Sequence, residues 1–277
     1  MAEISATAVK SLREQTGLPL MECKRALTET AGDIAAAIEY LRKAGKAKMI
    51  GRAADRETSF GRLAVFASFE PPVGSIIELR CESAPVASHE EFIKLAHNLA
   101  EQLALGAGAA TPEALLDEPS PGVPGGTLRQ QFDDLNNRIR EVFRLARIQR
   151  LDGACGGYVH HDGANAVLLQ IEGGNPEVAK DICMHIAASR PIVVAKEDLD
   201  PQLVAKEREI LSAQARQEGK PEKIIEKMVE GRLRDFYARQ CLLEQPFVKD
   251  SDQTVAQVAK AAGMKIVRFV HWMLGKE

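Results

Sequence analysis

The sequence lacks the short motifs that mark common hydrolases and nucleotide-binding enzymes. It contains no GxxxxGK[ST] phosphate loop, no GxSxG nucleophile elbow and no HExxH zinc helix. His160 and His161 are adjacent, so their side chains diverge, and no spaced third ligand accompanies them. Cys183 and His185 are two residues apart on an expected helix and cannot share a face. We therefore expect neither an enzyme nor a bound metal or cofactor.

The chain also lacks an excess of positive charge and any long apolar run. Its 36 Lys and Arg residues face 39 Asp and Glu, which gives a net charge of -3. No uniform positive field is available to attract a nucleic acid backbone. No apolar stretch approaches the length of a membrane span, and the N-terminus has no targeting pattern. We expect a cytoplasmic protein without direct nucleic-acid or membrane partners.

Cysteine pairs are missing as well. The chain has 5 cysteines, which is an odd number, and they are widely scattered with no CxxC motif. A disulfide framework or a structural zinc site needs paired or regularly spaced cysteines. We expect free thiols, as in a reducing compartment, and we interpret Cys81 as a buried structural residue.

The first fifty residues predict three short helices. Val9 and Leu12 lie three apart, and Gly17 ends their helix because glycine readily takes a left-handed backbone. Pro19 suits the first turn of a second helix, and Asp33 caps a third whose apolar stripe is Ile34, Ile38 and Leu41. The small and basic residues 44–48 are interpreted as a helix tail and a linker that leaves the first module movable. The apolar pair Leu20 and Met21 could face a partner or belong to the core.

The rest of the chain predicts two similar α+β halves. Each half has two β-prone runs joined by a turn and followed by an amphipathic helix, first over 62–99 and again over 158–186. Residues 106–126, rich in Gly, Ala and Pro, are expected to form a surface loop without regular structure. Apolar residues at threes and fours over 128–143 predict one long helix that ends near Gly153.

A charged region over 203–239 differs from these halves. Its two apolar stripes are broken at 219–221, which predicts an antiparallel helical hairpin. One stripe consists of Leu203, Val204, Ile210 and Leu211, which we expect to face one way. A short helix over 255–259 and a last strand over 266–274 complete the pattern.

Four separated motifs carry a resemblance to a known family. They are residues 16–27 (TGLPLMECKRAL), 184–191 (MHIAASRP), 220–232 (KP followed by MVEGR) and 245–248 (QPFV). These motifs are spread along nearly the whole chain. Their order is similar to that in bacterial translation elongation factor Ts. The resemblance implies an α+β fold with an N-terminal three-helix, UBA-like module, a two-subdomain core with antiparallel sheets and an inserted helical hairpin.

The resemblance and the pattern together suggest five segments. They are a docking module over 1–50, a first core half over 51–150, the start of a second half over 151–200, a dimerisation-type hairpin over 201–240 and the completion of the second half over 241–277. In that family the hairpin can mediate dimer contacts, so the resemblance implies a possible homodimer; a solvated stalk without a partner is the alternative. The implied function is guanine nucleotide exchange on elongation factor Tu. The implied partner is therefore elongation factor Tu in its GDP-bound and nucleotide-free forms.

The resemblance also implies which residues contact the GTPase. In the first module these are Arg13, Leu20, Met21 and Lys24, and elsewhere they are Ile139, Arg140, Tyr158 and His160. The family commonly has Thr-Asp-Phe-Val-Ala after its strand cysteine, and the Asp and Phe intrude beside the magnesium site of the GTPase. Here the exchange segment is Glu82, Ser83, Ala84, Pro85 and Val86, so the acidic and aromatic pair is replaced by Ala84-Pro85. Arg140 also stands where the family favours glycine.

Two interpretations follow from this departure. Exchange could be retained through a modified contact, with Pro85 as a rigid apolar group and Glu82 as the charge. The alternative is a module that docks on the GTPase, or on another partner, without driving exchange.

Overall fold

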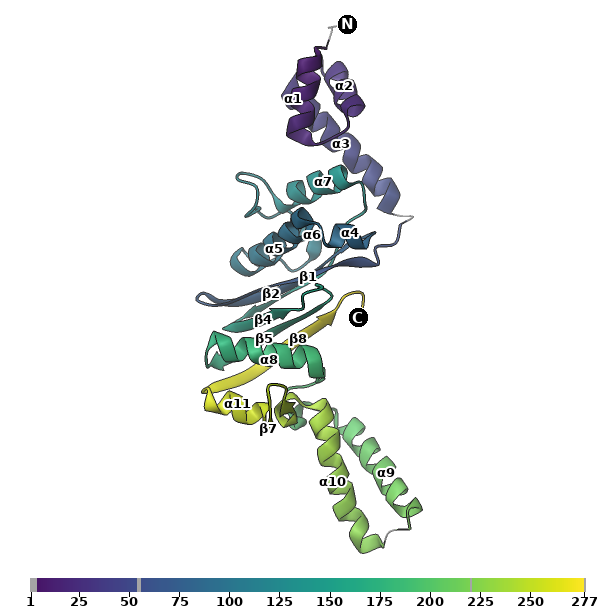
Figure 1. Cartoon of the computed structure of the whole chain (residues 1–277), viewed down its shortest axis with the longest axis vertical. Coiled ribbons are helices and arrows are strands. Elements are labelled where there is room, and N and C mark those ends of the chain that lie inside the picture. Colours follow the sequence, from purple (N-terminus) through teal and green to yellow (C-terminus); the bar gives the residue numbers. More distant parts are fainter. Residues whose placement is uncertain (1–3, 54–55, 220, 277) are drawn as a thin grey trace. The chain divides into compact units, whose positions relative to one another are not determined.

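The computed structural model of the chain describes residues 4–53, 56–219 and 221–276, and it is an α+β structure (Figure 1). The chain separates into two compact units. Unit 1 comprises Met1–Phe66, Ser75–Arg150 and Met273–Glu277. Unit 2 comprises Ala67–Gly74 and Leu151–Trp272. None of the helices in the described parts of the chain is both long and apolar enough to cross a membrane.

Unit 1 begins with the helices α1 (Ala6–Thr16), α2 (Leu20–Glu29) and α3 (Ile34–Ala53). As expected, Gly17 ends α1 in the left-handed conformation, with φ of 67°. The Asp33 carboxylate caps α3 by accepting the Ala36 N–H at 3.0 Å. The three helices share one apolar core, made of Val9, Leu12, Leu18, Cys23, Ala26, Leu27, Ala37 and Leu41.

Residues 44–48 are helical, as the expected helix tail requires, but the linker expected there is wrong because α3 continues to Ala53. Ala and Lys are good helix formers, and one glycine inside a helix costs only about 1 kcal/mol relative to Ala. Gly45 allows α3 to approach α7 closely, because a Cβ at this position would overlap the side chain of Asn137 on α7.

A three-stranded sheet of order β1-β2-β3 supports the rest of unit 1. Its strands are β1 (Phe60–Phe69), β2 (Pro72–Cys81) and β3 (Arg144–Asp152), and the predicted hairpin is β1 and β2. The helices of this region are α4 (Ala84–Ala87), α5 (Glu90–Leu105), α6 (Pro112–Leu116) and α7 (Leu128–Ile139). Buried side chains of β2, α5, α6 and α7 form one core cluster, which includes Ile77, Leu79, Cys81, Phe92, Leu95, Leu99, Leu115, Leu128 and Phe132.

The long helix expected to end near Gly153 is wrong. Helix α7 ends at Ile139, Arg140 takes a left-handed φ of 68°, and the chain then enters β3. The apolar spacing continues past this turn because Phe143 still packs into the core, edge-on to Phe92 with ring centroids 5.0 Å apart. The apolar spacing of threes and fours therefore continues beyond the helix into the connection between α7 and β3.

The loop expected over 106–126 does contain a regular element. Thr111 caps α6 through its side chain, and α6 buries Leu115 and Leu116 in the core. Beyond α6, the Ser120 hydroxyl donates to Gln131 Oε1 at 2.8 Å, and that oxygen also accepts from Asn98. Buried leucines and this polar trio order a stretch whose composition suggested only a loop.

Unit 2 contains the second half of the core. Strands β4 (Cys155–Val159), β5 (Asn165–Gly173) and β8 (Met264–Met273) form a sheet of order β4-β5-β8, and helix α8 (Pro176–Ser189) packs on β4 and β5. Beside it lie α11 (Val255–Ala261) and the small pair β6 (Pro246–Phe247) and β7 (Asp250–Thr254), which is antiparallel. Two 3₁₀ turns occupy Lys196–Asp198 and Leu242–Glu244.

Helices α9 (Pro201–Gln217) and α10 (Glu222–Gln240) also belong to unit 2 and pack against each other. Their shared core contains Leu199, Leu211, Ala215, Ile225, Val229, Leu233 and Phe236. The expected single stripe on the first arm is wrong in part, because Leu203 and Ile210 are exposed while Leu211 is buried. Successive residues of a helix point about 100° apart, so the four could not all face the partner helix.

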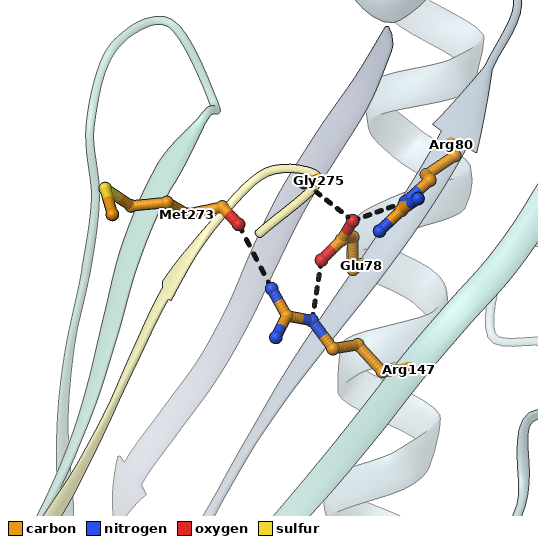
Figure 2. Close-up of polar contacts among 5 residues, drawn as sticks. All are labelled: Glu78, Arg80, Arg147, Met273 and Gly275. Atoms are coloured by element: carbon orange, nitrogen blue, oxygen red, sulfur yellow. Dashed lines mark hydrogen bonds and ion pairs between the residues drawn. The ribbon is translucent and has the colours of Figure 1, made fainter. Parts of the chain in front are cut away.

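A buried carboxylate lies on β2 within unit 1 (Figure 2). Glu78 is 0% exposed, and its two oxygens accept from Arg80 Nε at 2.5 Å and from Arg147 Nε at 2.6 Å. The same carboxylate accepts the Gly275 N–H at 3.1 Å, and Arg147 Nη2 donates to the Met273 carbonyl at 3.1 Å. The charge of Glu78 is thereby compensated, as a buried ion requires. The cluster ties the end of the chain to β2 and β3.

Candidate partner-binding site

The apolar pair at the start of α2 is exposed rather than part of the core. Leu20 is 49% exposed and Met21 is 71% exposed. The turns that follow bury Cys23, Ala26 and Leu27 instead. Large apolar side chains gathered at one exposed helix end are typical of an interaction surface.

Two basic residues accompany this pair in the first module. Arg13 on α1 and Lys24 on α2 are both exposed, and neither side chain forms an ion pair with a residue that the structure describes. Their charges are therefore available to orient an approaching partner.

The exchange segment leaves the sheet at the end of β2 and forms the short helix α4. Ser83 precedes this helix and donates twice to the Glu141 carboxylate, through its N–H at 3.1 Å and its hydroxyl at 2.5 Å. Both carboxylate oxygens of Glu82 also have partners. One oxygen accepts the Val142 N–H at 2.6 Å, and the other forms an ion pair with Arg56 at 2.5 Å. The Glu82 side chain is only 17% exposed, so its charge is used within the chain.

The next three residues of the segment present small apolar surfaces. Ala84 and Pro85 are exposed, whereas Val86 packs partly into the core of unit 1. Neither a carboxylate nor an aromatic ring is offered from positions 84 and 85. Pro85 in the first turn of α4 has a fixed φ and presents its ring to solvent.

The end of α7 connects this segment to the first module. Ile139 is partly buried against the core, and Arg140 adopts φ of 68° as the residue that terminates the helix. The Arg140 guanidinium donates to the Glu22 carboxylate of α2 at 3.0 Å. Glycine is the usual residue in this left-handed conformation, which costs other residues about 1–2 kcal/mol. The glycine expected here by resemblance therefore has a local structural reason, namely the end of a helix.

Unit 1 thus brings several predicted residues into one connected region. Glu22 follows Met21 directly and pairs with Arg140, and the next residue, Glu141, holds Ser83 at the start of the exchange segment. Sequence reasoning missed both Glu22 and Glu141. Their partners are 118 and 58 residues away in the chain, so no local pattern could have revealed them.

Tyr158 and His160 belong to unit 2, whereas the other predicted contact residues belong to unit 1. They lie on and just after β4, and the Tyr158 hydroxyl is 2.9 Å from His160 Nδ1. Both side chains are partly exposed. Their hydrogen bond fixes the orientation of the His160 ring.

The cysteine at the end of β2 lies in a setting that disfavours its thiolate form. Cys81 is buried, and this burial raises the pKa of its thiol to about 11. All five cysteines are free and buried. Among the described residues no group of three or more His, Cys, Asp or Glu side chains could hold a metal ion. The exposed groups of this region suit contact with another macromolecule.

Comparison with known proteins places the chain in a family. The family model described as Elongation factor TS matches residues 85–276. The elongation factor Ts of Thioalkalivibrio sulfidiphilus is 42% identical over 276 residues, covering 99% of this chain and 92% of that protein. The corresponding proteins of Methylococcus capsulatus and Clostridium botulinum strain Alaska E43 are 41% and 40% identical, with coverage of 99% of this chain and 92% and 93% of theirs. The chain belongs to the elongation factor Ts family.

Proposed function

We propose that this protein is a guanine nucleotide exchange factor that promotes GDP release from elongation factor Tu during polypeptide elongation in the cytoplasm. Membership of the elongation factor Ts family over nearly the whole chain carries this proposal. The exposed Leu20 and Met21 support it with a surface suited to a protein partner. The same three-helix module carries Arg13 and Lys24, whose side chains form no ion pair with any described residue.

Exchange of this kind is a matter of linked equilibria. A factor that binds the nucleotide-free GTPase more tightly than the GDP-bound form must weaken GDP binding by the same ratio. The factor makes and breaks no covalent bond. It needs only a docking surface and a group that fits the emptied nucleotide site better than the filled one.

The first module would supply the docking surface. Leu20 and Met21 would contribute apolar area at the centre of the contact, and Arg13 and Lys24 would orient the complex. The exchange segment and Ile139 would form a second contact, with the exposed ring of Pro85 in place of the usual Asp and Phe. Tyr158 and His160 would contribute from unit 2.

The docking role of the first module can be tested by replacing Arg13 and Met21 together with Ala. Both side chains are exposed, so the fold should be unaffected, while loss of two central contacts should weaken binding to elongation factor Tu about ten- to a hundredfold. Leu105→Ala, which truncates an exposed leucine of α5, is the matched control. Unchanged affinity of the double variant would contradict this docking role.

The comparisons give no support to docking without exchange. That alternative predicts binding to elongation factor Tu with an unchanged rate of GDP release. Measuring both quantities on the same preparation separates the two.

A further inference from the structure

The exchange segment presents no ring, yet an exposed aromatic side chain lies at the same end of the sheet. The exposed large apolar side chains in the described part of unit 1 are Leu20, Met21, Phe60 and Leu105. Phe60, 44% exposed, is the aromatic one among them. It is the first residue of β1.

The packing of Gly61 fixes where Phe60 lies. A Cβ at Gly61 would come within 2.7 Å of the Arg80 Cα, so Gly61 lies directly beside Arg80 on β2. Strands β1 and β2 are joined by a two-residue turn and must run antiparallel. One step further along, Phe60 therefore lies beside Cys81. The thiol of Cys81 in turn contacts the Ser83 carbonyl at 3.3 Å, at the start of the exchange segment.

The place of Phe60 in β1 sets which end of the sheet it occupies. Further along β1, Ala64 and Phe66 pack into the same helix-covered core as Cys81. Gly61 has a φ of 154°, and a Cβ there would overlap the Leu79 carbonyl oxygen, so the regular alternation of side chains does not extend across Gly61 to Phe60. Phe60 stands at the end of the sheet where the chain continues into α4. Arg56, four residues earlier, pairs with Glu82 and holds this stretch of chain against the exchange segment.

We propose that Phe60 is a contact residue for elongation factor Tu and supplies, from the start of β1, the aromatic group that Ala84 and Pro85 do not. The inference rests on the proposed function. It adds a residue outside the segment to which the family resemblance assigns the aromatic contact. The ring of Phe60 and the ring of Pro85 form the apolar parts of one contact, and Glu82 is held between Arg56 and Val142 rather than delivered to the partner.

The test compares Phe60→Ala, Phe60→Tyr and the control Leu105→Ala in the full-length protein. Two quantities are measured: the acceleration of release of a fluorescent GDP analogue from elongation factor Tu, and the affinity for nucleotide-free elongation factor Tu. Phe60→Ala should lower both by about tenfold, the usual scale for truncating a central aromatic contact. Phe60→Tyr and Leu105→Ala should remain within about twofold of the wild type. Circular dichroism and urea unfolding check that each variant is folded.

The outcomes separate this inference from the proposed function. Phe60→Ala with wild-type acceleration and affinity would overturn the role of Phe60 and leave exchange intact. If the wild-type protein binds elongation factor Tu without accelerating GDP release, the proposed exchange function is contradicted. In that case, weaker binding by Phe60→Ala would still support Phe60 as a contact residue. Absence of binding by the wild type would overturn both. An equal loss in the Leu105→Ala control would assign the effect to general loss of apolar surface and overturn the specific role of the ring.

Discussion

Replacing Glu78 with Gln should destabilise the protein although it preserves the size and shape of the side chain. One Glu78 oxygen accepts from Arg80 and Gly275, and the other accepts from Arg147 (Figure 2). In glutamine one of these oxygens becomes an amide NH₂ group, which is a donor. At least one arginine donor would then face another donor, and both guanidinium groups would lose their counter-charge.

The size of the effect follows from the burial of the cluster. Removing one partner of a buried ion pair costs about 3–5 kcal/mol, and each hydrogen bond to a charged group contributes about 1.5–3 kcal/mol. The side chains of Arg80 and Arg147 retain 27% and 26% exposure, so water can replace part of the lost interaction. We therefore expect a loss of about 3 kcal/mol in the free energy of unfolding, the lower end of that range.

Urea unfolding followed by tryptophan fluorescence is a suitable assay. The single tryptophan, Trp272, directly precedes Met273, whose carbonyl accepts from Arg147. With a slope of about 1–3 kcal/mol per molar urea, the midpoint should fall by roughly 1–3 M. The control is Glu172→Gln, which removes an exposed pair with Lys265 and should change stability by less than about 1 kcal/mol. A Glu78→Gln protein as stable as this control would refute the reasoning.

Two further predictions concern a buried histidine and the end of α7. His185 accepts the Val248 N–H at Nδ1 and faces Gln245 with Nε2, and burial lowers the pKa of His185 below its ordinary 6.5. The unfolded chain then binds the proton more readily, so the free energy of unfolding should fall as the pH drops below about 6.5. In urea titrations from pH 5 to 8, His185→Gln should make this pH dependence shallower. An unchanged dependence on pH would contradict the prediction. Arg140→Gly should be about 1 kcal/mol more stable than Arg140→Ala, because both lose the Glu22 pair and only glycine relieves the left-handed strain. Equal unfolding free energies of those two variants would count against the strain.

Local patterns predicted much of this fold. The stripe of Val9 and Leu12 and the left-handed Gly17 define α1 as expected, and the β1–β2 hairpin and helix α5 also form as predicted. These elements are set by residues three or four apart, or by a turn, so the information lies within a short window.

The errors arose where a pattern fits two structures. The spacing of apolar residues from α7 to Phe143 is typical of a helix. The helix nevertheless ends before Arg140, where the sequence has neither the glycine nor the proline that usually indicates a helix end. The short helix α6 was not predicted because its buried residues, Leu115 and Leu116, lie in a stretch rich in small residues and prolines.

The candidate site could be predicted only in part. The sequence left open whether Leu20 and Met21 face a partner or belong to the core, and the structure shows both to be exposed. The contacts that position the exchange segment join residues distant in the chain, so no local pattern indicates them. Glu78 carried a signal that was available and unused, since it is a lone acidic residue inside the apolar run of β2. A charge in such a run must be compensated by long-range partners when the strand is buried.

The most direct test of the account is the rate at which elongation factor Tu releases a fluorescent GDP analogue, measured with and without this protein alongside a binding titration. The account predicts strong acceleration that saturates with the concentration of this protein, together with tighter binding to the nucleotide-free GTPase than to its GDP-bound form. Release at the intrinsic rate in the presence of saturating protein would contradict it.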